Sequence, residues 1–197
     1  NANVGDTSLS CYARYVIGAM ADAYPRYCYF RMYVPRSEDN NEYDALAQRH
    51  NVESLLPDGG IWRKVPWLWH LLPIGRDMTR GDVELYHSLT TTLPYGLARR
   101  NIRSVVTVHS LDFLRLRGHS TRPTSIYRRI AMAETLRRAD RIVAVSQCVK
   151  RDIAHLLHID GDKIDVIYRG CHQRFNEPIT EQKINEVLAR DLDVRAD

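Results

Sequence analysis

The chain has 197 residues, 44% of them hydrophobic and 26% charged, which is enough for one sizeable core and too little for two. Its formal net charge of +4 fits a solvated basic surface, an acidic ligand or a peripheral membrane contact, and we expect no nucleic-acid partner. No apolar run approaches the roughly 20 residues that a membrane helix needs, so we expect a cytoplasmic protein.

The two ends of the chain and its cysteines add little to the fold. Residues 1–2 are interpreted as the remnant of a cleaved tag, and the chain is expected to begin inside a longer protein. The four cysteines lie far apart with no C-x-x-C pair, so we expect reduced thiols.

The first part of the chain is predicted to alternate helices and strands. Residues 7–24 place apolar side chains at helical spacing, which predicts an amphipathic helix. Residues 27–34 are dense in aromatic and β-branched side chains and predict a strand. A short helix is expected at residues 44–50, and residues 52–60 are interpreted as a connection that closes on two glycines.

The later part carries the clearest pattern. Residues 83–87 alternate and predict a short strand, and the apolar runs at 105–108 and 142–145 flank a long basic helical segment, as in a βαβ unit. Ser146 is a favourable cap for the next helix, and residues 163–168 predict another strand. This order predicts an α/β fold: a Rossmann-like, doubly wound three-layer sandwich with a mostly parallel sheet.

His109 directly follows the strand predicted at residues 105–108. Ligands of open α/β sheets collect at the carboxyl ends of the strands, so a titratable, hydrogen-bonding ring is expected at the usual ligand crevice. On the residues alone, the alternative is a histidine at a strand end whose ring hydrogen-bonds only to backbone groups.

Five strings carry a family resemblance when they are taken in order. They are TSLSCYARYVI, VELYHSLTTTLP, VVTVHSLDFLR, RRADRIVAVSQCVKRDI and KIDVIYRGC, and Phe175 is the fourth residue after the last of them. Together they resemble the amino-terminal domain of family 4 glycosyltransferases, which are retaining enzymes of the GT-B type with two Rossmann-like domains facing a cleft.

The resemblance implies that residues 3–175 form a Rossmann-like acceptor-side domain. Residues 176–197 would then lead, as a linker and helix, toward an absent carboxyl-terminal domain that binds the donor. The implied reaction transfers a sugar with retention from a nucleotide-sugar to a glycan or lipid-linked acceptor, as in bacterial polysaccharide biosynthesis. The nucleotide-sugar is a co-substrate, no metal or other cofactor is expected, and the chain is expected to be inactive alone.

Two other classes of protein are weighed against this one. A non-catalytic Rossmann-like binding or scaffolding domain is the main alternative. A nucleotide- or dinucleotide-binding Rossmann enzyme is disfavoured, because the chain has neither G-x-G-x-x-G nor a P-loop lysine motif.

The resemblance also implies roles for single residues. His109 would lie beside the donor sugar and hydrogen-bond to it, which suits a neutral imidazole that both donates and accepts. Ser110 stands where the family usually has Asp, which weakens the expected support of the His109 ring. Thr7, Ser8 and Ser10 occupy a turn where the family has glycines close to the donor phosphates, so phosphate contact and a plain helix cap both remain open.

Acceptor contacts are predicted at the same crevice. His87, Ser88 and Thr90 end a strand and begin its loop, although turn polarity explains them equally well. Arg115 lies in the loop after the next strand, where its guanidinium is either solvated or grips a phosphorylated acceptor. Ser146 is a further candidate, because its helix starts at this end of the sheet.

Two surface interactions are also expected. The basic helix presents either a solvated face or a docking surface for an anionic membrane, through Arg128, Arg129, Arg137 and Arg138. The family pattern places a central strand before residue 7, where only six residues stand. We therefore expect residues 3–6 or a neighbouring chain to fill that place, the latter giving a homo-oligomer through an exposed sheet edge.

Overall fold

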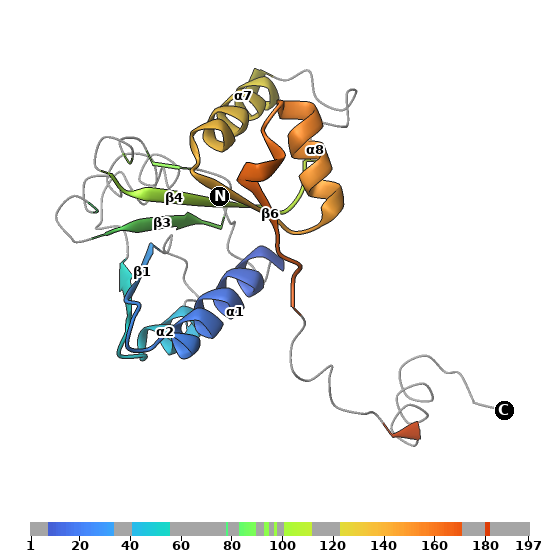
Figure 1. The fold of residues 1–197 in the computed structure, drawn as a ribbon. Coiled ribbons are helices and arrows are strands. Elements are labelled where there is room, and N and C mark those ends of the chain that lie inside the picture. Colours follow the sequence, from blue (N-terminus) through green and yellow to red (C-terminus); the bar gives the residue numbers. More distant parts are fainter. Residues whose placement is uncertain are drawn as a thin grey trace.

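The computed structural model of the protein describes residues 8–33, 41–55, 78, 83–89, 93–94, 97, 101–111, 123–170 and 180–181. Within them, all strand pairs are parallel and helices lie on both sides of the strands (Figure 1). The α/β, Rossmann-like architecture predicted from the sequence is therefore confirmed.

Four strands build the larger sheet and lie side by side in chain order. They are β3 (Leu85–Ser88), β4 (Arg103–Val108), β5 (Arg141–Ala144) and β6 (Ile164–Val166). Because parallel neighbours need crossover connections, α7 (Pro123–Arg138) joins β4 to β5, and α8 (Gln147–Leu157) with the short helix η2 (Gly161–Lys163) joins β5 to β6. The βαβ unit and the strand after it are thus confirmed, with boundaries within three residues of those predicted.

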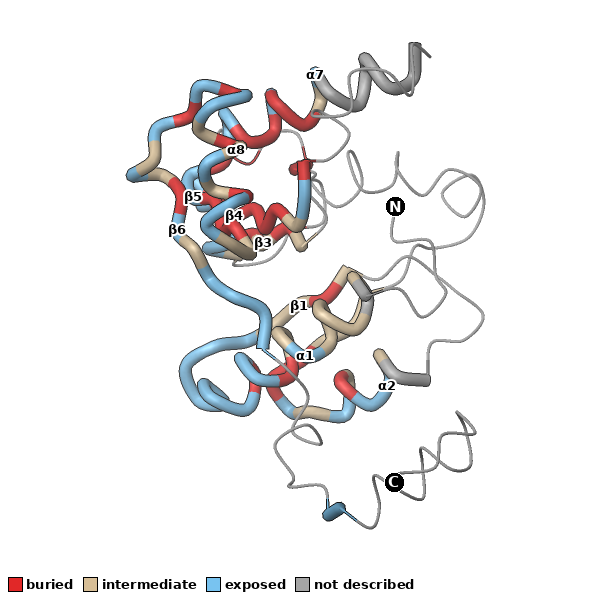
Figure 2. The backbone as a smooth tube through the Cα atoms, turned by 90° about the vertical axis from the view of Figure 1, so that its right-hand side faces the viewer, coloured by how far each residue is buried: buried red, intermediate tan, exposed pale blue. Residues whose placement is uncertain are grey.

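The core of this sheet lies between the strands and the two helices above them. The register pairs Val106 with Ile142 and Ile142 with Ile164, so these side chains share one face. They pack in one cluster with Leu136 of α7 and Ile153 of α8, and all five are at most 1% exposed. Figure 2 shows this buried band along the strands and the inner sides of the helices. Each such side chain contributes about 1.5–3 kcal/mol, which makes the strands a firm support for the residues at their ends.

A smaller parallel unit precedes this sheet. Its elements are α1 (Ser8–Ala23), β1 (Phe30–Tyr33), α2 (Asn41–Ala47) and β2 (Val52–Leu55). They share a small core of Ala21, Met32, Leu46 and Val52. Both Figure 1 and Figure 2 show α1 and α2 on the side of the strands opposite to α7 and α8, which gives the three layers.

The interpretation of residues 52–60 as a connection is wrong for the first four of them, which form β2. β2 pairs in parallel with β1, with Phe30 opposite Val52. The turn before β2 is fixed by Asn51, which is 4% exposed and whose side-chain amide donates to the carbonyls of Ala21 and Cys28 at 3.0 and 3.3 Å. The contacts that place β2 come from residues far away in the sequence. The four residues of β2 alone therefore did not predict a strand.

Element boundaries differ modestly elsewhere. The strand predicted at residues 27–34 is shorter because Tyr27 and Tyr29 stand 88% and 64% exposed before β1 begins. The helix predicted at residues 44–50 is displaced toward the amino terminus, since α2 starts at residue 41.

Among the described strands, β1 pairs only with β2 and β3 only with β4, so the strands form two sheets. A single continuous sheet would have excluded a strand supplied by residues 3–6 or by a neighbouring chain. Residues 3–6 lie outside the described part of the chain, and that hypothesis stays a prediction.

Candidate active site

His109 lies one residue beyond β4, half-buried, and meets two residues from other elements. Tyr12, one turn into α1, packs edge-on against its ring, with centroids 4.8 Å apart and an interplanar angle of 85°. The guanidinium of Arg169, three residues beyond β6, lies 5.6 Å from the centre of the Tyr12 ring. Figure 1 shows the start of α1 beside the segment that leaves β6. We call Tyr12, His109 and Arg169 the His109 cluster.

Both ring nitrogens of His109 have protein partners. Nδ1 lies 2.6 Å from Nη2 of Arg169, and Nε2 lies 3.2 Å from the carbonyl oxygen of Leu89. A guanidinium only donates and a carbonyl only accepts, so Nδ1 must be the acceptor and Nε2 must carry the hydrogen. The contacts therefore define one neutral tautomer of the imidazole.

The electrostatics of the cluster favour the same state. Burial lowers the pKa of His109, and the positive charge of Arg169 lowers it further, while the hydrogen bond to Leu89 acts in the opposite direction. At neutral pH the ring is thus an uncharged donor and acceptor, the form that suits a sugar hydroxyl. In this structure a hydroxyl would have to replace Arg169 at Nδ1 or the carbonyl at Nε2.

Sequence reasoning selected His109 but gave no role to Tyr12 or Arg169. Arg169 ends a predicted parallel strand, which is the same criterion that selected His109, so its position at the ligand edge was available from the sequence. Tyr12 had no comparable signal, because its approach to His109 depends on how α1 packs beneath the sheet.

The predicted acceptor residues do not all face solvent. His87 on β3 is half-buried, and its Nε2 lies 2.9 Å from Oγ1 of Thr107, which is fully buried. Burial lowers the pKa of His87. Ser88 is 2% exposed, so its hydroxyl is not open to solvent in this structure. Thr90 and Arg115 lie outside the described residues.

Ser146 caps α8, as the sequence predicted. Its extended backbone has φ −162° and ψ 164°, and its hydroxyl accepts from the amide of Val149 at 3.2 Å. The oxygen that was considered for the cleft is therefore engaged in holding a helix start.

The residues considered for phosphate contact are helical rather than part of a loop. α1 begins at Ser8 and includes Ser10. Placing Ser8 and Ser10 in a loop before the helix was wrong. Thr7 lies outside the described residues, and phosphate contact here stays a prediction.

The described residues contain no group of three or more metal-binding side chains of the kind His, Cys, Asp or Glu. Cys11, Cys28 and Cys148 form no disulfide bond. None of the described helices combines the length and apolarity needed to cross a bilayer.

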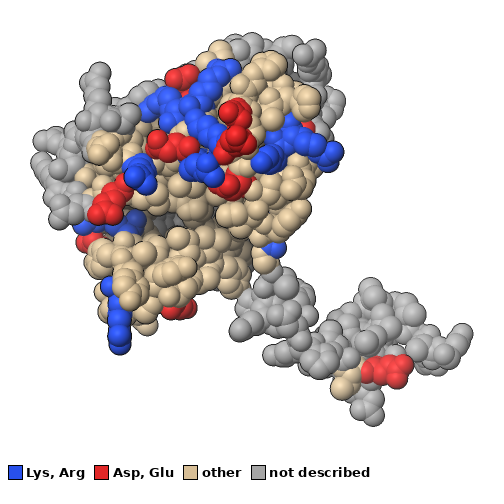
Figure 3. All heavy atoms as spheres, viewed as in Figure 1, with Lys and Arg blue, Asp and Glu red and all other residues tan. Residues whose placement is uncertain are grey.

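Charges are mixed on the face that carries α7 and α8. Figure 3 shows acidic side chains interleaved with Lys and Arg over these helices. Arg138 donates to the carbonyl of Pro94 at 3.3 Å, and the side chains of Arg128 and Arg129 lie outside the described part. A membrane-docking role for this helix stays a prediction.

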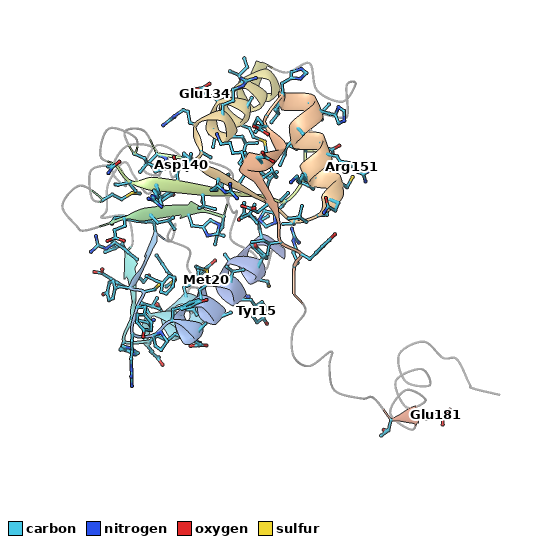
Figure 4. All side chains as sticks on the ribbon, viewed as in Figure 1. Tyr15, Met20, Glu134, Asp140, Arg151 and Glu181 are labelled. Carbon is cyan, nitrogen blue, oxygen red and sulfur yellow. The ribbon has the colours of Figure 1, made fainter. Side chains whose placement is uncertain are left out.

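At the opposite end of the sheet, Ser104 and Asp140 are joined by several hydrogen bonds, which we call the Ser104–Asp140 clasp. The amide and the hydroxyl of Ser104 each donate to Oδ2 of Asp140 at 2.7 Å, and the amide of Asp140 donates to the backbone oxygen of Ser104 at 3.0 Å. Figure 4 shows Asp140 beside the starting end of β4. The clasp fixes β5 against β4, whose other end carries His109.

Residues 13–173 match the model of glycosyltransferase family 4. The chain belongs to glycosyltransferase family 4. The match includes His109 and Arg169 and begins one residue after Tyr12, so two members of the His109 cluster lie in the family 4 region. The resemblance drawn from the sequence strings is thereby confirmed, as is a glycosyltransferase-type domain.

A comparison with curated proteins finds no match to this family 4 chain. Among solved structures, the crystal structure of a glycosyltransferase from Rickettsia africae ESF-5 is similar, with 18% sequence identity and a TM-score of 0.47. The similarity covers 86% of this chain and 50% of that one, so the chain spans half the length of that glycosyltransferase.

Proposed function

We propose that this chain is the acceptor-side half of a retaining glycosyltransferase. In this proposal a sugar passes from a nucleotide-sugar to a glycan or lipid-linked acceptor, and the donor is held chiefly by a second domain. The observation that carries the proposal is the neutral imidazole of His109 at the carboxyl end of β4, inside a region that matches glycosyltransferase family 4. Without a donor-binding domain, this chain alone is expected to transfer no sugar.

The proposed contribution of His109 is to bind and orient the transferred sugar. One ring nitrogen accepts and the other donates, so the ring can pair with a hydroxyl in either direction without changing its charge. A fixed ring at the end of a rigid strand also reduces the freedom lost when the sugar is bound. We assign His109 no general-base role, because retaining transfer does not require one on this domain.

The proposal also covers the surroundings of the reaction. We place the enzyme in the cytoplasm, where it takes a nucleotide-sugar and needs no metal, and we retain acceptor contacts at His87, Thr90 and Arg115. A peripheral contact with an anionic membrane would bring a lipid-linked acceptor to the same edge of the sheet.

A non-catalytic Rossmann-like binding domain is the second candidate, and one observation favours it. Both nitrogens of His109 are occupied by the protein itself, as in a histidine that only supports structure. Ser110 in place of the usual Asp points the same way.

The test is a donor screen on the full-length protein. Purified protein is incubated with a panel of nucleotide-sugars, with and without a lipid-phosphate or oligosaccharide acceptor. Nucleotide release is measured, and the anomeric configuration of the product is read by NMR. Transfer with retention supports the proposal. If the protein binds glycans but neither hydrolyses nor transfers sugar from any donor, the result favours the second candidate.

A further inference from the structure

Arg169 is held in place by uncharged groups. It is exposed, its guanidinium lies over the Tyr12 ring, and one Nη donates to His109. By contrast, Arg31, Arg49 and Arg141 each pair with a carboxylate at 2.7 to 3.1 Å. Within the described part of the chain, no carboxylate pairs with Arg169. No described carboxylate therefore neutralises its positive charge, while His109 and Tyr12 hold it in place.

Among the described residues, His109 is the hydrogen-bond partner of this guanidinium. A guanidinium has five N–H donors in a planar fork, and the contact with His109 uses one of them. Tyr12 and His109 hold the guanidinium through an uncharged ring and one hydrogen bond, contacts that a phosphate dianion can outcompete. A planar fork that pairs with no described carboxylate suits a phosphate, which it can bind through two parallel hydrogen bonds.

We propose that Arg169 is a phosphate-binding residue, and that phosphate binding changes the hydrogen-bond partner at Nδ1 of His109. Without the anion, Arg169 holds Nδ1, and the ring is kept in its neutral tautomer. A phosphate that draws the guanidinium away leaves Nδ1 open to a sugar hydroxyl or to a proton. Binding of the phosphate is thereby coupled to the availability of Nδ1 of His109 for a sugar hydroxyl. That the phosphate belongs to a glycosyltransferase substrate rests on the proposed function.

The coupling has a measurable sign. The charge of Arg169 lowers the pKa of His109, so a bound phosphate that neutralises this charge raises it. By linkage, protonation of His109 must strengthen phosphate binding to the same extent. Among the described residues, the charged and titratable side chains that contact the ring are Arg169, from the segment after β6, and Tyr12, from α1.

The experiment follows the imidazole ¹⁵N and ¹H signals of His109 by NMR in the 197-residue chain. The signals are assigned by their loss in His109→Gln. Inorganic pyrophosphate represents the diphosphate of a donor, and glycerol phosphate represents a phosphorylated acceptor. Each is titrated separately, and the tighter of the two identifies the source of the phosphate. The variants are Arg169→Gln, Arg169→Lys, and Arg151→Gln as the matched control, because Arg151 is an exposed arginine on α8.

We expect saturable shifts of the His109 signals with at least one phosphate, and a rise in the His109 pKa on saturation. Arg169→Gln should weaken binding by about tenfold or more and raise the pKa of the unliganded ring. Arg169→Lys should keep the low pKa but bind less tightly, because an ammonium lacks the fork. Arg151→Gln should bind as the parent does.

Two results would overturn the inference: no saturable shift with either phosphate in the parental chain, or equal binding by Arg169→Gln and the parent. Because binding is measured without sugar transfer, the phosphate site and the proposed function can fail separately. A full-length protein that binds pyrophosphate through Arg169 but transfers no sugar would contradict only the latter.

Discussion

The Ser104–Asp140 clasp gives a sharp test of how the strand ends are held. The change is Asp140→Asn, which keeps the shape of the side chain and removes its charge. The hydroxyl and amide of Ser104 hold the pKa of Asp140 below its ordinary value of 3.8, with Lys163 and Arg103 adding to the effect and burial opposing it. An amide at this position imitates the protonated acid at every pH.

The expected magnitude follows from two hydrogen bonds to one carboxylate oxygen. Such bonds stabilise a protein by about 1.5–3 kcal/mol each when they are buried. Asp140 is exposed, so water competes for the carboxylate and the figure must be discounted. We expect Asp140→Asn to lower the free energy of unfolding at pH 7 by about 1 kcal/mol, which is about 2–4 °C in Tm for a chain of this size.

The assay is urea unfolding followed by circular dichroism between about pH 7 and about pH 3. Since the pKa of Asp140 is depressed in the folded state, its stabilisation is present above the unfolded value of 3.8 and is lost as pH falls through the folded value. The difference between parent and variant should therefore shrink toward zero in acid. Asp165→Asn is the control, because the exposed Arg141–Asp165 pair should contribute no more than about 0.5 kcal/mol. A difference that persists unchanged in acid would show that the hydrogen bonds to Asp140 do not depend on its charge.

Three further changes test other parts of the account. Burial lowers the pKa of His87 from 6.5, so the free energy of unfolding should decline as pH falls from 6.5 toward the pKa of the folded state. In His87→Gln, the free energy of unfolding should decline less over the same pH range. Ser146→Ala removes the acceptor for the amide of Val149 and should lower the free energy of unfolding by about 1 kcal/mol, whereas Ser146→Asp should not; equal melting temperatures would contradict the cap. Ile153→Ala should lower that free energy by about 2–5 kcal/mol, because Ile153 is fully buried; a loss below about 1 kcal/mol would show a core that adapts.

The sequence predicted those elements whose signals are local. A few consecutive residues suffice to predict the apolar strands β4 and β5. The same holds for α8, which has the Ser146 cap and an apolar face. The strand-end rule found His109, because parallel strands bring their carboxyl ends to one edge regardless of the loops between them. Family strings added what periodicity alone does not supply, namely the class of chemistry.

What the sequence did not reveal depends on contacts between distant residues. β2 has little strand propensity of its own and is fixed by β1 and by the buried Asn51. The pairing of Arg169 with His109 spans 60 positions and requires β6 to lie two strands from β4. Tyr12 joins them only through the packing of α1. Such a cluster has no period and no motif.

In the proposed enzyme, His109 faces the transferred sugar. The most direct test of this contact is the rate of sugar transfer by the full-length protein carrying His109→Ala, compared with His155→Ala, which removes an exposed histidine from α8. Loss of a hydrogen bond to a substrate group is worth about 1–3 kcal/mol, so we expect the first variant to be slower by roughly tenfold to a hundredfold and the second to match the parent. Parental rates from a folded His109→Ala protein would show that His109 does not contact the transferred sugar.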